Sequence, residues 1–315
     1  MAERAPAVPA IEVFKPKKRL PWYIECWPRL VKEKPLGTVG GVLVLLMLFT
    51  GIFANFIAPY GMNETRLADR LQPYSLKHPL GTDALGRDML SRIIFGARIS
   101  MFVGLGAVGI SVVGKTLIGT TTGYFGGWWD MVMQRIVDAW MCFPGLVILL
   151  TIMALIGPGL GNIIFALSLG ATFGASRTIR GATVGIKENQ YVEAARAVGC
   201  SQARVILVYI LPNIMAPLII SATVSLGGVI LAESSLSFLG FGIPPPNPSW
   251  GGMLSGSGRT YMLTAPWMAI WPGVALSLVV FGFNMLGDGL RDVLDPRLRG
   301  SQGARFGAGA TSGLA

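Results

Sequence analysis

The sequence is poor in charged residues and in the side chains that build catalytic or metal sites. Asp, Glu, Lys and Arg together make up 13% of its 315 residues, about half their share in an ordinary soluble domain. It has one histidine, His78, and three cysteines, Cys26, Cys142 and Cys200, and the cysteines fall in predicted cytoplasmic or intramembrane positions, so no disulfide framework or metal site is implied. Because no nucleophile or acid/base pair is legible either, we expect neither an enzyme nor a bound metal.

Apolar segments dominate the rest of the chain. Hydrophobic residues make up 52% of it, and a helix needs about 20 mostly apolar residues to cross the hydrocarbon core of a bilayer. The fourth apolar run is the shortest, and we expect its helix to continue beyond the membrane through Arg177 and Arg180. The sequence predicts an all-α integral membrane protein with six transmembrane helices, over residues 36–56, 99–123, 136–155, 161–176, 213–234 and 265–286.

The distribution of lysine and arginine sets the predicted orientation. Six spans place both termini on one side, and most basic residues collect on that side, which the positive-inside rule makes the cytoplasm. The net charge of +10 then follows from the topology, and we expect no nucleic acid as a partner. The cluster KPKKR at 15–19 is expected to lie against membrane lipid. The predicted parts are cytoplasmic tails over 1–35 and 291–315, a transmembrane domain over 36–290, outer loops over 57–98 and 235–264, and a cytoplasmic loop over 177–212. The first 35 residues are too polar for a signal peptide.

Residues 109–116 read GISVVGKT and match G-x-x-x-x-G-K-[ST], the pattern of a nucleotide-binding P-loop. A working P-loop follows a strand and opens a helix, so that its backbone N–H groups meet phosphates in water. Here the match lies inside the apolar run 99–123, and the segment most like a magnesium-binding strand, VILAE at 229–233, ends another span. We therefore interpret the match as chance and expect no ATPase site in this chain.

Lys115 belongs to that match and lies within a predicted span, where a lysine costs roughly 2.5 to 3.5 kcal/mol on insertion scales. Two interpretations stay open. Its long side chain could snorkel to the cytoplasmic end of the helix, about 12 Å away. It could instead face a water-filled path through the protein, which makes Lys115 a candidate pathway residue.

The stretch NQYVEAARAVGCSQARVILVYILPN, residues 189–213 and here called the elbow, is too polar to insert and well punctuated. It predicts two short helices. Gly199 can take the left-handed conformation that ends the first helix, and Ser201 can cap the second. Pro212 then starts the next span at a position where proline is tolerated. A compact elbow with an alanine face is suited to docking in a partner's groove, although an amphipathic connector would have a similar pattern.

The elbow resembles the EAA loop of the permease subunits of binding-protein-dependent ABC importers. Their pattern is E-A-A, three residues, G and a later I-L-P-like triplet, which in this sequence is Ile210-Leu211-Pro212. Tyr209 stands where the family usually has histidine, which leaves the partner contacts open. The resemblance implies that the loop is the coupling helix that sits on an ATPase subunit. The coupling residues would be Glu193, Ala194, Ala195, Gly199, Leu211 and Pro212.

Three further stretches resemble the second permease of the dipeptide, oligopeptide and nickel importers. They are HPLGTDALGRDMLSRIIFGARIS at 78–100, LAESSLSFLGFGIPPPNPSWGGML at 231–254 and FNMLGDGLRDVLDPRLR at 283–299. The resemblance implies a type I ABC importer permease fold in a prokaryotic cytoplasmic membrane. The implied partners are a second homologous permease, two cytoplasmic ATPase subunits that bind ATP and magnesium, and an extracytoplasmic substrate-binding protein. The chain itself would bind no cofactor.

Three polar residues allow both a structural and a functional interpretation. His78 has no catalytic partner in the sequence, so we expect it to pack or cap a loop. Asp138 follows Arg135 at the spacing of a same-face helical pair, which favours a structural ion pair over a substrate ligand. Glu233 lies near the outer end of the fifth span, where it could meet the amino group of a peptide or be solvated among headgroups. With Lys115, Asp138 and Glu233 are the candidate pathway residues.

The resemblance implies transport by alternating access, in which two permeases form the pathway and two ATPases close on ATP. The alternative is a stand-alone, ion-coupled secondary transporter, which would show broken helices in paired halves and acids near the membrane midplane. The sequence has no convincing internal repeat, and its acids lie near span ends. Relatives with these motifs carry dipeptides, oligopeptides, glutathione-like compounds, nickel chelates and some sugars, so the resemblance leaves the cargo open among these.

Overall fold

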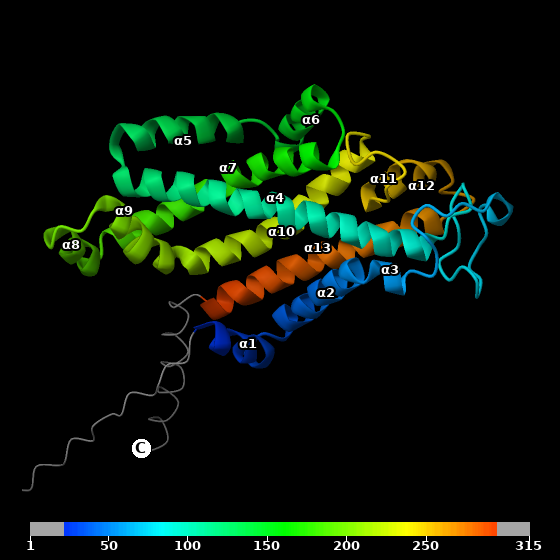
Figure 1. Ribbon diagram of the computed structural model, residues 1–315, viewed down its shortest axis with the longest axis horizontal. Coiled ribbons are helices and arrows are strands. Elements are labelled where there is room, and N and C mark those ends of the chain that lie inside the picture. Colours follow the sequence, from blue (N-terminus) through cyan, green and yellow to red (C-terminus); the bar gives the residue numbers. More distant parts are fainter. Residues whose placement is uncertain (1–21, 295–315) are drawn as a thin grey trace, which may run out of the picture.

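The computed structural model describes residues 22–294, and its regular elements are helices (Figure 1). Within this range the one strand-like pairing is an isolated bridge between Thr82 and Asp88. The all-α prediction is therefore confirmed for the described residues, while the cluster at 15–19 and the residues from 295 onward lie outside them. The chain runs back and forth through α2 (Pro35–Ile52), α4 (Met89–Phe125), α5 (Gly127–Met141) with α6 (Gly145–Ile156), α7 (Leu160–Lys187), α10 (Met215–Phe238) and α13 (Trp267–Leu294).

The short elements gather at the two ends of this bundle (Figure 1). One end, called the elbow end, carries α8 (Gln190–Ala197) and α9 (Gln202–Arg204), and α1 (Trp22–Glu33) and the last residues of α13 lie toward it. The opposite end, called the loop end, carries residues 58–88 with η1 (Leu67–Asp69), α3 (Ala54–Ile57), α11 (Trp250–Ser255) and α12 (Ser257–Thr260). The first and last described helices thus end on the side of the elbow.

Four helical stretches are long and apolar enough to cross a membrane. They are α2, α4, α13 and the continuous stretch Gln202–Phe238, and the bent pair α5–α6 makes a fifth if it counts as one span. The long helix α7 has 28 residues, or about 42 Å, and it continues past Arg177 and Arg180 as expected. The chain is a multi-pass membrane protein, and six spans remain the prediction.

The predicted third span, 136–155, is wrong as a single helix. The structure divides it into α5 and α6, which meet at 90° across the break at Cys142–Pro144. Proline disfavours helical conformation in the residue before it and cannot donate a helix hydrogen bond. Pro144 followed by Gly145 therefore explains the bend.

The predicted second span also starts too late, because α4 begins at Met89. Asp88 caps this helix by accepting a hydrogen bond from the backbone N–H of Ser91 at 2.8 Å. The ring nitrogen Nδ1 of His78 lies 3.0 Å from Asp88 Oδ1, and the ring packs on Tyr60 with centroids 5.0 Å apart. His78 is buried, so it holds the cap and packs the loop, as the sequence predicted.

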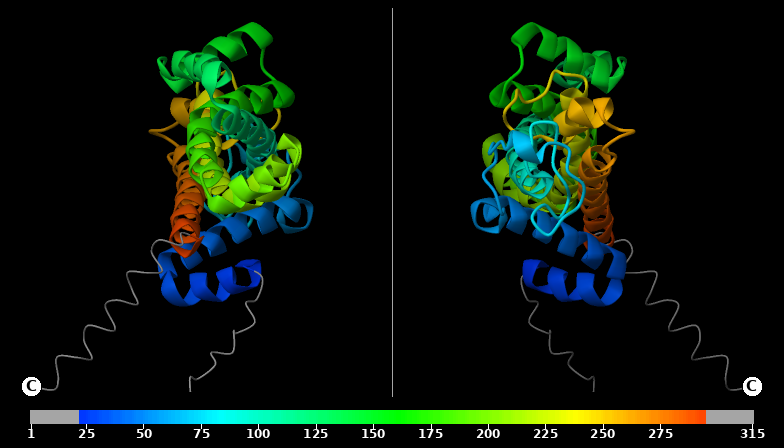
Figure 2. Two further views of the ribbon diagram at one scale, coloured as in Figure 1. Left: turned by 90° about the vertical axis from the view of Figure 1, so that its left-hand side faces the viewer. Right: turned by 90° about the vertical axis from the view of Figure 1, so that its right-hand side faces the viewer.

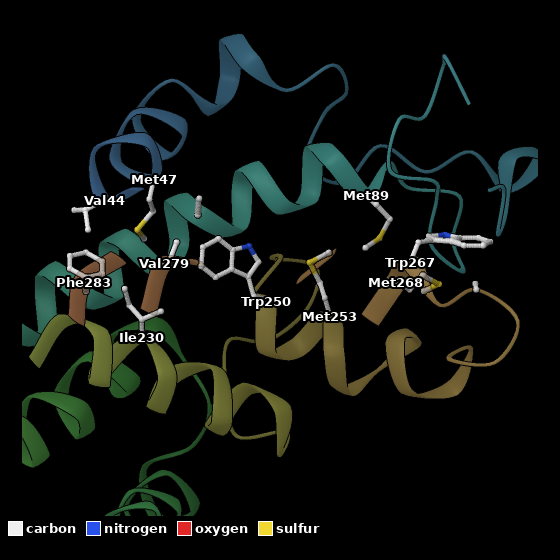
Figure 3. Packing of buried hydrophobic residues seen from close by; sticks show 12 residues of the cluster. Val44, Met47, Met89, Ile230, Trp250, Met253, Trp267, Met268, Val279 and Phe283 are labelled. Carbon is white, nitrogen blue, oxygen red and sulfur yellow. The ribbon is translucent and has the colours of Figure 1, made fainter. Parts of the chain in front are cut away.

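The helices pack on two sides of α4 and α10. End-on views place α2 and α13 on one side and α5 with α6 on the other (Figure 2). Glycines let α2 and α13 approach closely, since a Cβ on Gly40 would come within 2.6 Å of the carbonyl oxygen of Gly282. Trp250 of α11 lies in this core between Val279 and Met253 (Figure 3), and its indole N–H donates to the carbonyl oxygen of Ile93 at 3.1 Å. The bundle thus closes around a buried aromatic side chain near the loop end.

Candidate functional site

The elbow has the turn that its sequence predicts. Gly199 has φ +86, and its N–H and that of Cys200 donate to the carbonyl oxygens of Arg196 and Ala195 at 2.9 and 3.0 Å, as in a helix ended by a left-handed glycine. A Cβ on Gly199 would meet nothing within 4 Å, so the backbone conformation and not space requires glycine. Ser201 Oγ accepts from the N–H of Arg204 at 3.4 Å. Both predicted helix signals are confirmed.

One face of α8 anchors the elbow to the bundle. Val192 and Ala195 are buried, and Val192 belongs to an apolar cluster with Ile179 of α7. The guanidinium of Arg196 lies 4.9 Å from the ring centroid of Tyr124, at the end of α4. The helix α8 is therefore in contact with two long helices of the bundle, α4 and α7.

The opposite face of α8 is open. Glu193, Ala194, Ala197 and Val198 are exposed, and 85% of Val198 is accessible. The predicted alanine face is therefore divided, because Ala195 is buried and holds α8 in place. What remains outside is a small, mostly apolar surface beside one carboxylate.

Leu211 and Pro212 lie inside a continuous helical stretch that begins at Gln202, well before the predicted span start at 213. The segment Val205–Ile210 is a π-helix and Leu211–Ile214 is a 3-10 turn. Proline has no N–H for the regular helix bond, and such local changes of helix type absorb that loss. Leu211 is half-buried and Pro212 is exposed.

A hollow of about 910 Å³ opens between α7, α10 and α13. A second hollow of about 360 Å³ lies next to it, and both are lined by Ala171, Gly174 and Ser225. Together they form one depression, called the central groove. Its walls are mostly small or apolar, with Asp288 and Arg291 as its charged residues.

Lys115 lies behind this groove. Its side chain is 0% exposed, and its Nζ donates to Ser221 Oγ at 2.9 Å. Ser221 lines the groove. The snorkelling interpretation is wrong, because α7 and α10 pack over this part of α4 and keep the ammonium inside the protein. The structure also places all of GISVVGKT inside α4, where the backbone N–H groups form helix bonds and cannot cradle a phosphate.

Asp138 is an ion-pair partner between helices. Its carboxylate pairs with Arg177 of α7 and with Arg135, which lies 3.5 Å away on α5. A second pair joins the same two helices, since Arg180 Nε donates to Asp130 Oδ1 at 2.6 Å. These contacts agree with the structural interpretation of Asp138. The partner on α7 was missed, because the sequence does not show which helices lie side by side.

Glu233 is fully buried, which contradicts both of its sequence interpretations. Its side chain is 0% exposed, so it meets neither a headgroup nor a ligand in a groove. Ser237 Oγ donates to its Oε1 at 2.7 Å, and Ser234 Oγ to its Oε2 at 3.3 Å. Ser237 lies one helical turn further along α10, so the helix itself supplies the partners of this acid.

Two acids of the loop end, Asp69 and Glu64, are held in ion pairs. Lys77 Nζ lies 2.8 Å from Asp69 Oδ2, and this hydrogen bond holds the pKa of Asp69 below its usual range. The hydrogen bond from Arg66 likewise lowers the pKa of Glu64. Among the residues that the structure describes, no group of three His, Cys, Asp or Glu could hold a metal ion.

The sequence matches a known family over more than half of its length. The family described as binding-protein-dependent transport system inner membrane component matches residues 115–300. The chain belongs to this family. A second family, the N-terminal transmembrane domain of oligopeptide transport permease C, matches residues 22–73. Membership favours an importer permease over a stand-alone secondary transporter.

Two curated relatives cover nearly the whole chain. The dipeptide transport system permease protein DppC of Alkalihalophilus pseudofirmus is 40% identical over 89% of this chain and 91% of its own length. The glutathione transport system permease protein GsiD of Escherichia coli is 38% identical over 94% of this chain and 98% of its own length. The four sequence motifs thus identified the family correctly.

A solved structure shares the fold. The MetNI methionine ABC transporter, in inward-facing conformations, matches with a TM-score of 0.53 and 18% identity, over 66% of this chain and 98% of the matched chain. At this identity the likeness concerns the fold alone. It is the fold of an ABC importer permease.

Proposed function

We propose that this chain is one of two homologous permease subunits of an ABC importer for small peptide-like solutes in a prokaryotic cytoplasmic membrane. Two ATPase subunits would bind ATP and magnesium on the cytoplasmic side. A substrate-binding protein would deliver cargo on the other side, and membrane lipid would surround the spans. The relatives are named for dipeptide and glutathione transport, and both solutes are short peptides that carry free carboxylates.

The observation that carries this proposal is the division of α8 into two faces. Val192 and Ala195 fix the helix to the bundle, while Glu193, Ala194 and Val198 point away from it. An apolar surface on a firmly anchored helix is suited to receive force from a partner. We assign the elbow to the ATPase contact, with Gly199, Leu211 and Pro212 shaping its turn and its junction with α10.

The central groove supports half of a translocation pathway. It is open along α7 and α10 and is lined mostly by small or apolar side chains, so a second permease facing it would enclose a wide passage with few polar groups to hold a solute. Lys115 supplies a buried positive charge one hydrogen bond away from the wall, through Ser221. Asp138 and Glu233 take structural roles in this arrangement.

Reconstitution distinguishes this function from the secondary-transporter alternative. The chain is co-expressed with the second permease, ATPase and binding-protein genes of its own neighbourhood, and uptake of labelled dialanine and glutathione into vesicles is measured. We expect uptake to require ATP and every partner. Uptake driven by an ion gradient into vesicles that contain this chain alone would contradict the proposal.

Cysteine accessibility tests the proposed topology of six spans with cytoplasmic termini. Asn63, Thr260 and Gln190 are exposed, and each is replaced by cysteine in a version that lacks Cys26, Cys142 and Cys200. In intact cells an impermeant thiol reagent should label Asn63→Cys and Thr260→Cys but not Gln190→Cys. Labelling of Gln190→Cys from outside would show that the proposed orientation is wrong.

A further inference from the structure

A separate pocket of about 380 Å³ lies at the loop end. Its walls come from the first turn of α4, the end of α10, α11 and the proline-rich segment that joins the last two. This volume is in the range of small-molecule sites, roughly 300 to 1,000 Å³. The motif at 78–100 supplies its charged residues, Asp83, Arg87 and Arg92, and the proposed function leaves these without a role.

Arg92 is the unusual member of this pocket. Its side chain is 7% exposed, and its Nη1 has no hydrogen-bond partner among the residues that the structure describes. Its nearest carboxylate oxygen, Asp83 Oδ2, lies 3.8 Å from Nε, which is too far for a hydrogen bond. A buried guanidinium with a free N–H is costly unless an acceptor meets it.

The acid in the pocket is already satisfied by other groups. Asp83 Oδ1 accepts from the N–H groups of Leu85 and Arg87, at 2.8 and 2.9 Å. Its Oδ2 accepts from Arg87 Nε at 2.6 Å. The nearby hydroxyl of Ser237 donates away from the pocket, to Glu233. Arg87 is thus neutralised by Asp83, and Arg92 leaves the pocket with one uncompensated positive charge.

We propose that this loop-end pocket binds the carboxylate of a small peptide-like substrate, with the free Nη1 of Arg92 donating to it. The assignment of peptides as the source of the carboxylate rests on the proposed function. A single net positive charge matches a carboxylate better than a doubly charged phosphate, and guanidinium–carboxylate contacts are among the strongest hydrogen bonds in proteins. The pocket would select free acids at the loop end, before the solute enters the central groove.

Binding of dialanine and of dialanine amide to the full-length chain in lipid nanodiscs tests this proposal. Equilibrium dialysis should show that the acid binds at least about tenfold more tightly than the amide. Acetate should compete with dialanine, and acetamide should not. Equal affinity for acid and amide, or no binding of either, would overturn the proposal without any variant.

Two variants place the effect at the pocket. Arg92→Gln should remove the preference for the acid, whereas Arg66→Gln, an exposed arginine of the same segment that pairs with Glu64, should keep it. If Arg92→Gln abolishes docking of the substrate-binding protein and leaves dialanine binding unchanged, the pocket is a contact site for that protein and the proposal is wrong. If the Arg92→Gln variant is not inserted into the membrane, the comparison of dialanine with its amide on the unmodified chain tests the proposal instead.

Uptake by the complete importer separates this inference from the proposed function. If the importer takes up dialanine but the chain binds dialanine and its amide equally well, the pocket assignment fails and the permease function stands. The opposite result is also informative. If acetate competes with dialanine for binding, if this competition depends on Arg92, and if the complete importer does not take up dialanine, the carboxylate site stands and the peptide cargo fails.

Discussion

The two ends of the molecule use their sequence motifs in opposite ways. At the loop end, His78 and Asp88 are buried and bonded to each other and to the start of α4. At the elbow end, Glu193, Ala194 and Val198 are exposed on a helix held only by its inner face. Buried contacts such as those of Asp88 stabilise the fold of the chain itself, while an exposed apolar face on an anchored helix needs a partner to explain it. This contrast separates the structural part of the chain from its proposed coupling surface.

The largest expected effect is at the loop end, from Asp88→Ala. It removes the cap of α4 and the hydrogen-bond partner of the buried His78 ring, which should cost about 3 kcal/mol of unfolding free energy. Denaturation of the purified protein in mixed micelles measures this cost. The exposed residue Glu64 is the control, because Glu64→Ala should leave the midpoint nearly unchanged. Equal effects of the two variants would show that the loop-end motif does not stabilise the fold through its buried contacts.

A smaller effect is expected behind the central groove. Ser221→Ala removes the partner of Lys115 Nζ and should cost about 2 kcal/mol, because it leaves a buried ammonium unpaired. Lys115→Met removes the charge itself and should leave the stability unchanged or higher. The same denaturation assay compares the two. If Lys115→Met is the more destabilising variant, the ammonium has a favourable partner besides Ser221.

Gly199→Ala should cost about 1 kcal/mol, because a residue with a Cβ is disfavoured at φ +86. The cost is local to the elbow, so amide exchange in α8 should speed up roughly fivefold while that of α4 is unchanged. Gly185→Ala is the matched control, since this glycine lies within α7 and a Cβ there meets nothing within 4 Å. Unchanged exchange in α8 would mean that the turn tolerates side chains.

The smallest effect is a pH dependence at the loop end. The bond to Lys77 lowers the pKa of Asp69, so its stabilising contribution is present at neutral pH. It is lost as pH falls below roughly 4 and the carboxylate is protonated. The difference in melting temperature between the natural protein and Lys77→Met should therefore shrink as pH decreases from 6 to 3. A difference that grows instead would contradict the assigned pairing.

Local signals in the sequence were enough to predict the turn and cap of the elbow, but they could not predict contacts between side chains of different helices. Gly199 and Ser201 act within a few residues of their partners, so their roles could be predicted. Pro144 carried a signal for the bend between α5 and α6, but the apolar run around it has the length of one span. Ser221 is separated from Lys115 by 106 positions, and no local pattern could have joined them.

The loop-end pocket shows the same limit. Asp83, Arg87 and Arg92 lie close together in one motif, yet three charged residues at this spacing are typical of an ordinary exposed turn. The free N–H of Arg92 is recognised only in the folded protein, where Arg92 is buried and lines one pocket with residues of α10 and α11. Burial, which depends on the whole fold, turns a common pattern into a candidate site.

Crosslinking between the elbow and the ATPase tests the central claim most directly. In the assembled importer, Ala194→Cys and Val198→Cys should each crosslink to the ATPase subunit, with a yield that changes when ATP is added. Thr260→Cys, exposed at the loop end, should give no such product in the same complex. An assembled, ATP-hydrolysing complex in which neither elbow cysteine crosslinks would contradict the assignment of α8 as the coupling surface.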